Sequence, residues 1–449
     1  MLLKNIYLWL LLGLFFDNIK FMKAELLSIL FLLSFNLLFS QKEIVQIPIG
    51  EASKKSEKIT LELAHRFQHY NNKNLHQNDN YDKSIHSPKS VKILDEKKKF
   101  YVHSLEGYTT SIYSLEDFKL LSTIDHRFNA ENQHLFLDTF YFNQNFRTKS
   151  KDLNIFNGKP VESCFTHNGK YLWVTYYRRS YDKNAIDPSA VCIIDTDIDS
   201  IVRVIPTGPL PKMITASTDN KRVAISHWGN NTVALLNIES NNPKDFYYIK
   251  EILVDKKLSL NYKEGEKVNR DQGCGACLRG TIFTPDLKYL LIGKMGGAAV
   301  AVIDMEQEKY IGDIKGMRGN LRHLIINKGW LYISINKYGY IQRTPLNSFL
   351  AHIKTLSQPY KKWEEVYVGV GARTIEASSD GAYIFACVNN GSKLVVVNTG
   401  DMTVETSIRV DSYPVGLDIS KDNNWLITTS QGRSMKGGNS VCVFKARYN

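Results

Sequence analysis

A short phrase recurs along this chain and limits its fold more than any other feature. Each copy has a small polar residue, a turn built mostly from Asp, Asn and Gly, and then four or five apolar or β-branched residues. The copies are THNGKYLWVTY (166–176), STDNKRVAISH (217–227), TPDLKYLLIGK (284–294), SSDGAYIFACV (378–388) and SKDNNWLITTS (420–430). A polar turn followed by such a run is typical of a β-hairpin. One unit cannot bury its own faces, and a four-stranded unit of about 40–45 residues is typical of a propeller blade.

Extending the repeat in both directions predicts an all-β protein, a seven-bladed β-propeller of four-stranded antiparallel blades. The units are expected at 90–125, 158–208, 208–255, 275–315, 316–368, 369–410 and 411–449. The last unit ends too early to contain its outermost strand. We therefore predict that an N-terminal strand completes the last blade, which would close the ring and remove an open sheet edge.

The segment EIVQIPIG (43–50) is the strand that we expect to close the ring. It matches IVRVIPTG (201–208), the outermost strand of the second unit, including the Ile-Pro-x-Gly ending. The predicted propeller domain is then 41–449, with a closing strand at 43–50, a polar insertion at 51–89 and the blades at 90–449. We expect the insertion to have little to bury, because it is rich in Lys, Asn and His.

The repeat resembles that of the YVTN-repeat, YncE-like seven-bladed β-propeller family, whose repeats are WD40-like. Trp173-Val174-Thr175-Tyr176 stands closest to the tetrad that names the family. The resemblance covers roughly residues 43 to 449. It implies an exported or surface-associated binding propeller, while similar propellers include lactonases and redox enzymes.

The first 40 residues predict export. Two apolar stretches, 6–16 and 26–39, are both short for a membrane span. The second follows Met22-Lys23 and ends in a small residue, as a secretory signal does. We interpret 1–40 as a signal peptide region with a true start at Met22, and expect a secreted, periplasmic or cell-surface protein of the cell envelope. A retained two-part anchor is the alternative.

The chain is basic, with a formal net charge of +12. A positive surface favours anionic partners, although solvated Lys side chains alone would give the same composition. We expect a monomer that binds an anionic small molecule, a glycan or an envelope protein. Nucleic acid is an unspecific alternative, because the sequence contains no recognised nucleic-acid module.

The six cysteines do not form an evident disulfide framework. Cys164, Cys192, Cys387 and Cys442 fall within predicted strands, where a single Cys usually behaves as a small apolar residue. Cys274 and Cys277 form CGAC in a Gly-rich segment and are a candidate for a local disulfide. The spacing fits neither covalent haem attachment nor a complete zinc site.

The long insertions are expected on one face of the ring. Crossovers between blades and loops between second and third strands share a face, and the long segments 51–89, 125–157, 178–188 and 255–273 all belong to these two types. Loops on a rigid scaffold often carry function. This face is therefore where we expect a ligand.

Four cations occupy the same position of the aligned repeats, at the start of the innermost strand. They are Lys212, Arg279, Arg322 and Arg373, and the corresponding residues of two other units are Val161 and Val415. Because innermost strands line the central channel, these side chains are candidate ligands for a carboxylate, phosphate or sulfate at the channel mouth. Alternatively, each pairs with a neighbouring acid such as Glu376 or Asp271 and only holds blades together.

The loops after the second strands supply further candidates on the same face. The candidate ligand-binding residues there are His103, Tyr176, Arg178, His227, Trp228, Lys294, Asn336 and Asn389. Aromatic rings beside cations suit sugars or single-stranded nucleic acid. The same residue types are also ordinary in propeller loops.

The sequence favours binding over catalysis. It has no linear hydrolase, metal or phosphate-loop motif, so no catalytic residue, metal site or cofactor is predicted. The expected function is therefore an exported, non-catalytic propeller that binds an anionic ligand or a partner on the insertion-bearing face. A propeller enzyme of the lactonase or quinoprotein-like type is the alternative.

Overall fold

The computed structural model describes residues 43–137, 146, 152–259, 266, 268–434 and 436–449. The chain divides into two compact units, Met1–Glu43 and Ile44–Asn449, and the following description concerns the second. The predicted signal region, 1–40, and the alternative start at Met22 lie outside the described residues.

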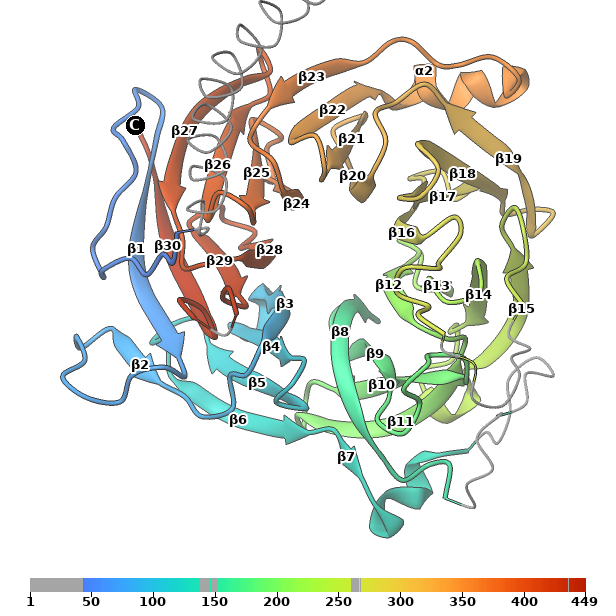
Figure 1. Cartoon of the computed structure of the whole chain (residues 1–449), viewed down its shortest axis with the longest axis horizontal. Helices are drawn as coiled ribbons and strands as arrows, with labels where there is room; N and C mark the ends of the chain where they lie inside the picture. Colours follow the sequence, from blue (N-terminus) through green and yellow to red (C-terminus); the bar gives the residue numbers. More distant parts are fainter. Residues whose placement is uncertain (1–42, 138–145, 147–151, 260–265, 267, 435) are drawn as a thin grey trace, which may run out of the picture. The chain divides into compact units, whose positions relative to one another are not determined.

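The second unit is an all-β ring of seven antiparallel sheets, arranged as the blades of a propeller (Figure 1). The repeat therefore predicted both the fold class and the number of blades correctly. The seven inner strands, in order of the blades, are β3 (Pro88–Leu94), β8 (Phe156–Thr166), β12 (Pro211–Ala216), β16 (Leu278–Phe283), β20 (Leu321–Asn327), β24 (Ala372–Ala377) and β28 (Pro414–Ile419).

The recurring phrase of the sequence forms the turn into the second strand of a blade and then that strand. The second strands are β4 (Lys99–Ser104), β9 (Tyr171–Arg179), β13 (Arg222–His227), β17 (Tyr289–Lys294), β21 (Trp330–Ile335), β25 (Tyr383–Val388) and β29 (Trp425–Ser430). The third strands are β5 (Thr109–Ser114), β10 (Ser189–Asp195), β14 (Thr232–Asn237), β18 (Ala299–Asp304), β22 (Tyr340–Pro345), β26 (Lys393–Asn398) and β30 (Ser440–Tyr448).

The outer strands of the first six blades follow their third strands directly. They are β6 (Leu120–Asp125), β11 (Ser200–Thr207), β15 (Tyr247–Leu253), β19 (Lys309–Lys315), β23 (Glu364–Tyr367) and β27 (Thr403–Arg409). The short strand β7 (Arg127–Phe128) pairs with the start of β8. The described helices are short: α2 (Leu346–Ala351), η1 (Asp95–Lys97), η2 (Ala130–Leu135), η3 (Pro243–Asp245) and η4 (His352–Thr355).

The apolar core lies between neighbouring blades. Each of the seven clusters of buried apolar residues combines side chains from two adjacent sheets, so the core forms a ring around the channel. Alternating strand residues face the two neighbours of a blade, as sheet packing requires. Tyr171 and Trp173, for example, pack against the third blade, while Leu172 and Val174 pack against the first.

An N-terminal strand completes the last blade, but the expected segment 43–50 is the wrong one. The strand that pairs with β30 is β1 (Ile59–Gln68), in antiparallel register from Ile59 opposite Tyr448 to Gln68 opposite Ser440. A further strand, β2 (Asp79–Tyr81), pairs in parallel with β1. The segment 51–89 is therefore no polar insertion, since it contains both of these strands.

Residues 44–49 lie instead against the last two blades as an irregular segment. Val45 and Ile47 are buried in the cluster between the sixth and seventh blades, and their backbone N–H groups donate to Ser412 Oγ at 2.7 Å and Asp411 Oδ1 at 3.1 Å. These donors bond to side chains, so the segment adds no strand to the sheet. The closing topology is nevertheless the predicted one, because β1 takes the outer position that 43–50 was expected to take.

A buried ionic network holds the closing strand. The guanidinium of Arg66, on β1, donates to Asp79 and lies 3.5 Å from Asp411, and its Nη1 donates to the backbone oxygen of Ile47 at 2.6 Å. Asp411 also accepts from Ser440 Oγ at 2.7 Å. Burial opposes the charge on Arg66, but the bond to Asp79 and the field of Asp411 together raise the pKa of Arg66.

Replacement of Arg66 tests how much this network stabilises the ring. Arg66→Gln leaves two buried carboxylates without their cation, so we expect the free energy of unfolding to fall by about 3 kcal/mol. Urea unfolding followed by circular dichroism measures the change. The control is Glu62→Gln, which breaks the exposed pair with Arg447 on the same two strands and should cost less than about 1 kcal/mol. Equal effects of the two substitutions would contradict this account.

Candidate functional site

Each inner strand carries an irregularity near its start, just after its first residue pair with the second strand or, in β8, after its second. The register shifts after Pro88, Pro160, Pro211, Leu278, Leu321, Ala372 and Pro414. A β-bulge leaves a residue unpaired and redirects its side chain. The residues that follow these pairs, here called the bulge positions, are Lys89, Val161, Lys212, Arg279, Arg322, Arg373 and Val415.

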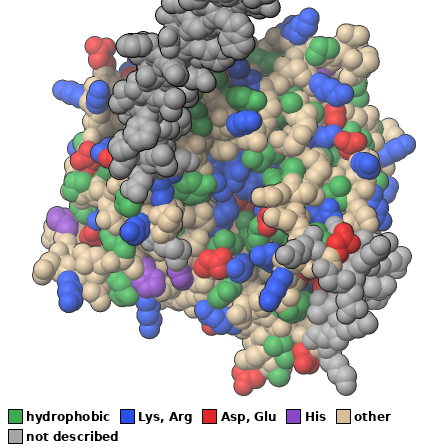
Figure 2. Space-filling model, in the orientation of Figure 1, with side chains coloured by type: hydrophobic (Ala, Val, Ile, Leu, Met, Phe, Trp, Pro, Cys, Tyr) green, Lys and Arg blue, Asp and Glu red, His purple; other side chains and the backbone are tan. Residues whose placement is uncertain are grey.

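The bulge positions bring cations from four blades together at the channel. Lys89 Nζ lies 3.6 Å from Glu162 Oε1, and Arg279 Nη2 donates to the same oxygen at 3.3 Å. Glu162 is on the second blade and Arg279 on the fourth, so this ion pair skips the blade between them. We define the basic cluster as Lys89, Arg279, Arg322 and Arg373. Figure 2 shows Lys and Arg side chains gathered at the centre of the ring on this face.

Two members of the basic cluster have buried donor groups without a hydrogen-bond partner. Nζ of Lys89 and Nε of Arg373 have no hydrogen-bond partner among the described residues, and each of these two residues is only 8% exposed. Arg322 has one weak contact, from Nη1 to Met295 Sδ at 3.9 Å. Buried polar groups without partners are rare in folded proteins, and each calls for an explanation such as strain, a functional role, or a bound water or ion.

The electrostatics show that these cations repel one another. Burial, and then the field of Arg373, lower the pKa of Arg322 well below its usual value. Burial and the field of Arg279 lower the pKa of Arg373 to about 10, and burial and Arg373 lower that of Lys89 well below its usual value. Burial opposes ionisation of Glu162, but Lys89 and Arg279 together hold its pKa below the ordinary range. One carboxylate therefore does not neutralise the cluster.

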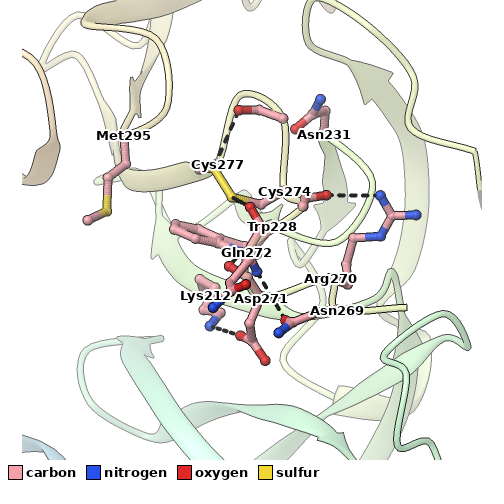
Figure 3. The surroundings of a disulfide bond; sticks show 12 residues. Lys212, Trp228, Asn231, Asn269, Arg270, Asp271, Gln272, Cys274, Cys277 and Met295 are labelled. Atoms are coloured by element: carbon pink, nitrogen blue, oxygen red, sulfur yellow. Dashed lines mark hydrogen bonds and ion pairs between the residues drawn. A yellow bond between two sulfur atoms is a disulfide. The ribbon is translucent and has the colours of Figure 1, made fainter. Parts of the chain in front are cut away.

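Lys212 has the predicted position but a different environment. Its Nζ donates to Asp271 Oδ1 at 3.1 Å and lies 4.2 Å from the ring centroid of Tyr177 and 5.0 Å from that of Trp228 (Figure 3). Burial lowers the pKa of Lys212 to about 7, partly offset by Asp271. Lys212 therefore pairs with a neighbouring acid, as the alternative to ligand binding expected. Glu376 pairs instead with Lys92, at 3.7 Å.

The CGAC segment forms a compact loop beside Lys212. Cys274 and Cys277 are joined by a disulfide, with their Cα atoms 4.9 Å apart (Figure 3). The loop packs tightly on the turn at Gly296, where an added Cβ would lie 2.4 Å from the backbone oxygen of Gly275. This segment leads directly into β16 and therefore positions Arg279, the second residue of that strand. Trp228 Nε1 donates to the backbone oxygen of Asp271 at 3.2 Å, which holds the preceding residues in place.

Several residues expected on exposed loops are buried instead. His103, Tyr176, His227 and Lys294 lie within the second strands, and Asn389 directly follows one. Lys294 donates to Asp255 and Asp313, each at 2.6 Å, so it is part of an internal ion-pair cluster. The expected place of these residues on loops is therefore wrong for the four within strands, and all five are at most 4% exposed, while their role as ligand contacts stays a prediction.

The buried histidines join neighbouring blades. His103 is hydrogen-bonded to Thr110 Oγ1 and Ser163 Oγ, both at 2.8 Å. Thr110 is also hydrogen-bonded to His126 at 2.7 Å, and His126 to the hydroxyl of Tyr176 at 2.8 Å. This chain of polar groups links the first blade to the second. His227 forms a similar internal bond with Thr207 Oγ1 at 2.7 Å.

The other candidate loop residues are partly exposed but make internal contacts. Arg178 Nη1 donates to the backbone oxygen of Lys183 at 2.9 Å, and Asn336 Nδ2 donates to that of Ala372 at 3.2 Å. Trp228 lies beside Lys212, as described above. Trp228 thus contacts a bulge position directly, and Asn336 bonds to the residue before another, Arg373.

Sequence reasoning missed two important residues, Lys89 and Glu162. Lys89 was assigned to the insertion 51–89, one residue before the predicted first blade. The signal that could have revealed it is the dipeptide Pro88-Lys89, which corresponds to Pro160-Val161, Pro211-Lys212 and Pro414-Val415 in other blades. Glu162 follows Val161 directly and supplies the acid that the aligned cations lacked.

Searches for a membrane span and for a metal site gave no candidates within the described ranges. There, no helix is both long and apolar enough to cross a bilayer. The same residues contain no group of three or more His, Cys, Asp or Glu side chains placed to hold a metal ion.

Comparison with known proteins supports the fold. No family model matches the chain. Antigen Lp49 of Leptospira interrogans serogroup Icterohaemorrhagiae serovar copenhageni (strain Fiocruz L1-130) is 24% identical over 199 residues, which cover 39% of this chain and 39% of the antigen. The chain thus matches well under half the length of that relative.

Two solved structures resemble the ring at low sequence identity. Hydrazine synthase of Kuenenia stuttgartiensis has a TM-score of 0.54 and 11% identity, and the match covers 80% of this chain and 95% of that one. The β-propeller domain of Cps50 (Swd1) of Myceliophteria thermophila has a TM-score of 0.53 and 11% identity, covering 79% and 96%. At this identity the likeness shows the propeller fold alone.

The buried histidines predict acid lability. Burial lowers the pKa of His103, His126 and His227 to about 3, from an ordinary value of 6.5. Between these two values the unfolded chain binds more protons than the folded one, so the free energy of unfolding falls as pH drops. Each residue contributes up to about 1.4 kcal/mol per pH unit in this window. Urea unfolding at several pH values from neutral to acidic measures the slope.

A matched pair of variants checks the origin of the slope. His227→Asn should flatten the pH profile, whereas the exposed His134→Asn should leave it unchanged. If both variants give profiles parallel to that of the unmodified protein, the buried imidazole of His227 does not contribute to the slope.

The basic cluster predicts opposite effects of removing an acid and removing a cation. Glu162→Gln removes the acid nearest the cations and should lower the free energy of unfolding by about 2 kcal/mol. Arg322→Met relieves repulsion and desolvation, so it should raise stability by about 1 kcal/mol. Thermal and urea unfolding without added multivalent anions measure both. Destabilisation by Arg322→Met as large as that by Glu162→Gln would contradict the mutual repulsion described above.

Proposed function

We propose that this protein is a binding propeller that captures an anionic ligand at the mouth of its central channel. The observation that carries the proposal is the basic cluster, in which Nζ of Lys89 and Nε of Arg373 are buried and have no hydrogen-bond partner among the described residues. An oxyanion would supply acceptors for these donors. It would also relieve the repulsion that lowers the pKa values of Lys89, Arg322 and Arg373.

The chemistry of the cluster suits an oxyanion more than a cation. Guanidinium groups form paired hydrogen bonds with carboxylate, phosphate or sulfate, and such bonds are stronger where water is partly excluded. A Ca²⁺ site would require several converging oxygen ligands with negative charge. Here the carboxylate of Glu162 pairs with Lys89 and Arg279, and no ion pair is found for Arg322 or Arg373 among the described residues.

We propose in addition that the protein is exported and acts at the cell envelope. The signal-like pattern of residues 1–40 supports this, and the name of the Leptospira relative, an antigen, is compatible with exposure at a surface. A glycan or an envelope protein that presents a carboxylate or phosphate group would be an appropriate partner. The binding unit in this proposal is the monomeric ring.

Removal of the three arginines tests the proposal. Arg279→Gln, Arg322→Gln and Arg373→Gln, combined in one variant, should weaken binding of sulfate and inorganic phosphate by well over about 10-fold, because each charge-assisted hydrogen bond contributes about 1.5–3 kcal/mol. Isothermal titration calorimetry at constant ionic strength measures the affinity, and the ligand-dependent rise in Tm provides an independent measure.

A control variant removes the same charge elsewhere. Arg127→Gln, Arg222→Gln and Arg447→Gln remove cations that are paired on the surface of the ring. This variant should retain the affinity of the unmodified protein. The proposal would be contradicted if neither anion binds the unmodified protein at low salt. It would also be contradicted if both triple variants lose affinity equally, because the anion would then not bind specifically at the channel mouth.

A further inference from the structure

The unused donors of the channel mouth are concentrated on one side of the ring. Nε of Arg373, Nε of Arg433 and Nζ of Lys89 are buried and have no hydrogen-bond partner among the described residues. Arg373 belongs to the sixth blade, Arg433 to the loop between the second and third strands of the seventh, and Lys89 to the first. These three blades follow one another around the closed ring.

The opposite side of the cluster is already engaged. Arg279, on the fourth blade, donates through Nη2 to Glu162 at 3.3 Å and through Nη1 to the backbone oxygen of Lys212 at 3.1 Å. Lys212, on the third blade, is paired with Asp271. Arg279 and Lys212 therefore have acceptors already, and Lys89 shares Glu162 with Arg279, whereas Nε of Arg373 and Nε of Arg433 have no acceptor among the described residues.

Tyr413 links two of the unused guanidinium groups. The central carbon of Arg373 lies 6.0 Å from its ring centroid, and that of Arg433 lies 5.7 Å from the same centroid. Arg433 is anchored through Nη2 on the backbone oxygen of Asn389 at 2.9 Å, which leaves its Nε free. Both cations thus have defined positions beside the bulge position of the seventh blade.

That bulge position is occupied by an apolar residue. Val415 stands where five other blades have Lys or Arg, so no cation from the seventh inner strand fills this part of the channel mouth. Blades six, seven and one thus place donors around an uncharged position, that of Val415. A small ligand with several acceptor oxygens suits these donors, because they come from two strands and one loop of three different blades.

Charge sets the valence of that ligand. A singly charged anion would leave a positive excess beside the buried side chains of Lys89 and Arg373, and the repulsion between these two residues would persist. A dianion or trianion would come closer to neutralising the excess. We infer that the ligand is a multivalent oxyanion, either a di- or tricarboxylate or a phosphate or sulfate group, bound by Lys89, Arg373 and Arg433 in front of Val415. This inference rests on the proposed function and specifies the class of ligand for the same site.

Calorimetric titration of the full chain with a graded series of anions tests the inference. Butyrate, glutarate and tricarballylate differ mainly in their number of carboxylates, and sulfate and inorganic phosphate form a tetrahedral arm. At constant ionic strength we expect tricarballylate or a tetrahedral dianion to bind at least about 10-fold more tightly than butyrate, a difference of about 1.4 kcal/mol. Tighter binding of the carboxylates would identify the ligand as a di- or tricarboxylate, and tighter binding of sulfate or inorganic phosphate would identify a tetrahedral anionic group.

Two substitutions locate the effect. Arg433→Gln and Lys89→Gln should each reduce the preference for the multivalent anion by about 5-fold or more, because each removes one charge-assisted contact. Arg447→Gln, an exposed arginine of β30 paired with Glu62, is the matched control and should leave the preference unchanged. Circular dichroism spectra of the variants confirm that they are folded, and Arg433→Gln alone suffices if Lys89→Gln does not fold.

The possible outcomes separate the two proposals. Equal affinity for all valences would overturn the multivalent ligand but leave the anion site in place. A preference for multivalent anions that is unaffected by Arg433→Gln and Lys89→Gln would overturn the location. Failure of every anion to bind would overturn both this inference and the proposed function.

Discussion

Closure of the ring is the constraint on which the rest of this structure depends. The inner strands of seven blades can converge on a channel only if the last blade is held beside the first. Here the pairing of β1 with β30 completes the last sheet, and the network of Arg66, Asp79 and Asp411 holds β1 in place. The closing strand also removes a sheet edge that would otherwise be open to other chains.

The convergence of cations follows from a repeated backbone irregularity within that closed ring. A bulge near the start of every inner strand aims one side chain per blade at the channel mouth, and Lys or Arg occupies it in five of the seven blades. Burial and mutual repulsion lower the pKa values of several of these groups. Such an arrangement lowers stability without a ligand, and violations of this kind are typical of functional sites.

The sequence predicted the parts of the molecule that the repeat encodes locally. The polar turns and apolar runs located the blades, and alignment of the repeats placed Lys212, Arg279, Arg322 and Arg373 in one equivalent position, as the structure has them. The closing strand was misassigned because the Ile-Pro-x-Gly ending of 43–50 imitates that of 201–208. In β1, a bulge between Leu63 and His65 interrupts the alternation that marks a strand.

The partners of side chains from different blades could not be predicted from the repeat. His103 was expected on a loop, but it lies in β4, where it is buried and hydrogen-bonded to Ser163 of the next blade. Glu162 reaches Arg279 across an intervening blade, and such a contact leaves no trace in the spacing of residues. The same limitation explains why Lys212 was grouped with the basic cluster, although Asp271 neutralises it.

The most direct test of the central claim is a structure determined from crystals that were grown with selenate or soaked in it. Anomalous scattering from selenium then locates the anion. The account predicts an anomalous peak at the channel mouth within hydrogen-bonding distance of Lys89 Nζ or the Arg373 guanidinium. Peaks confined to exposed surface lysines, with the channel mouth holding only water, would contradict it.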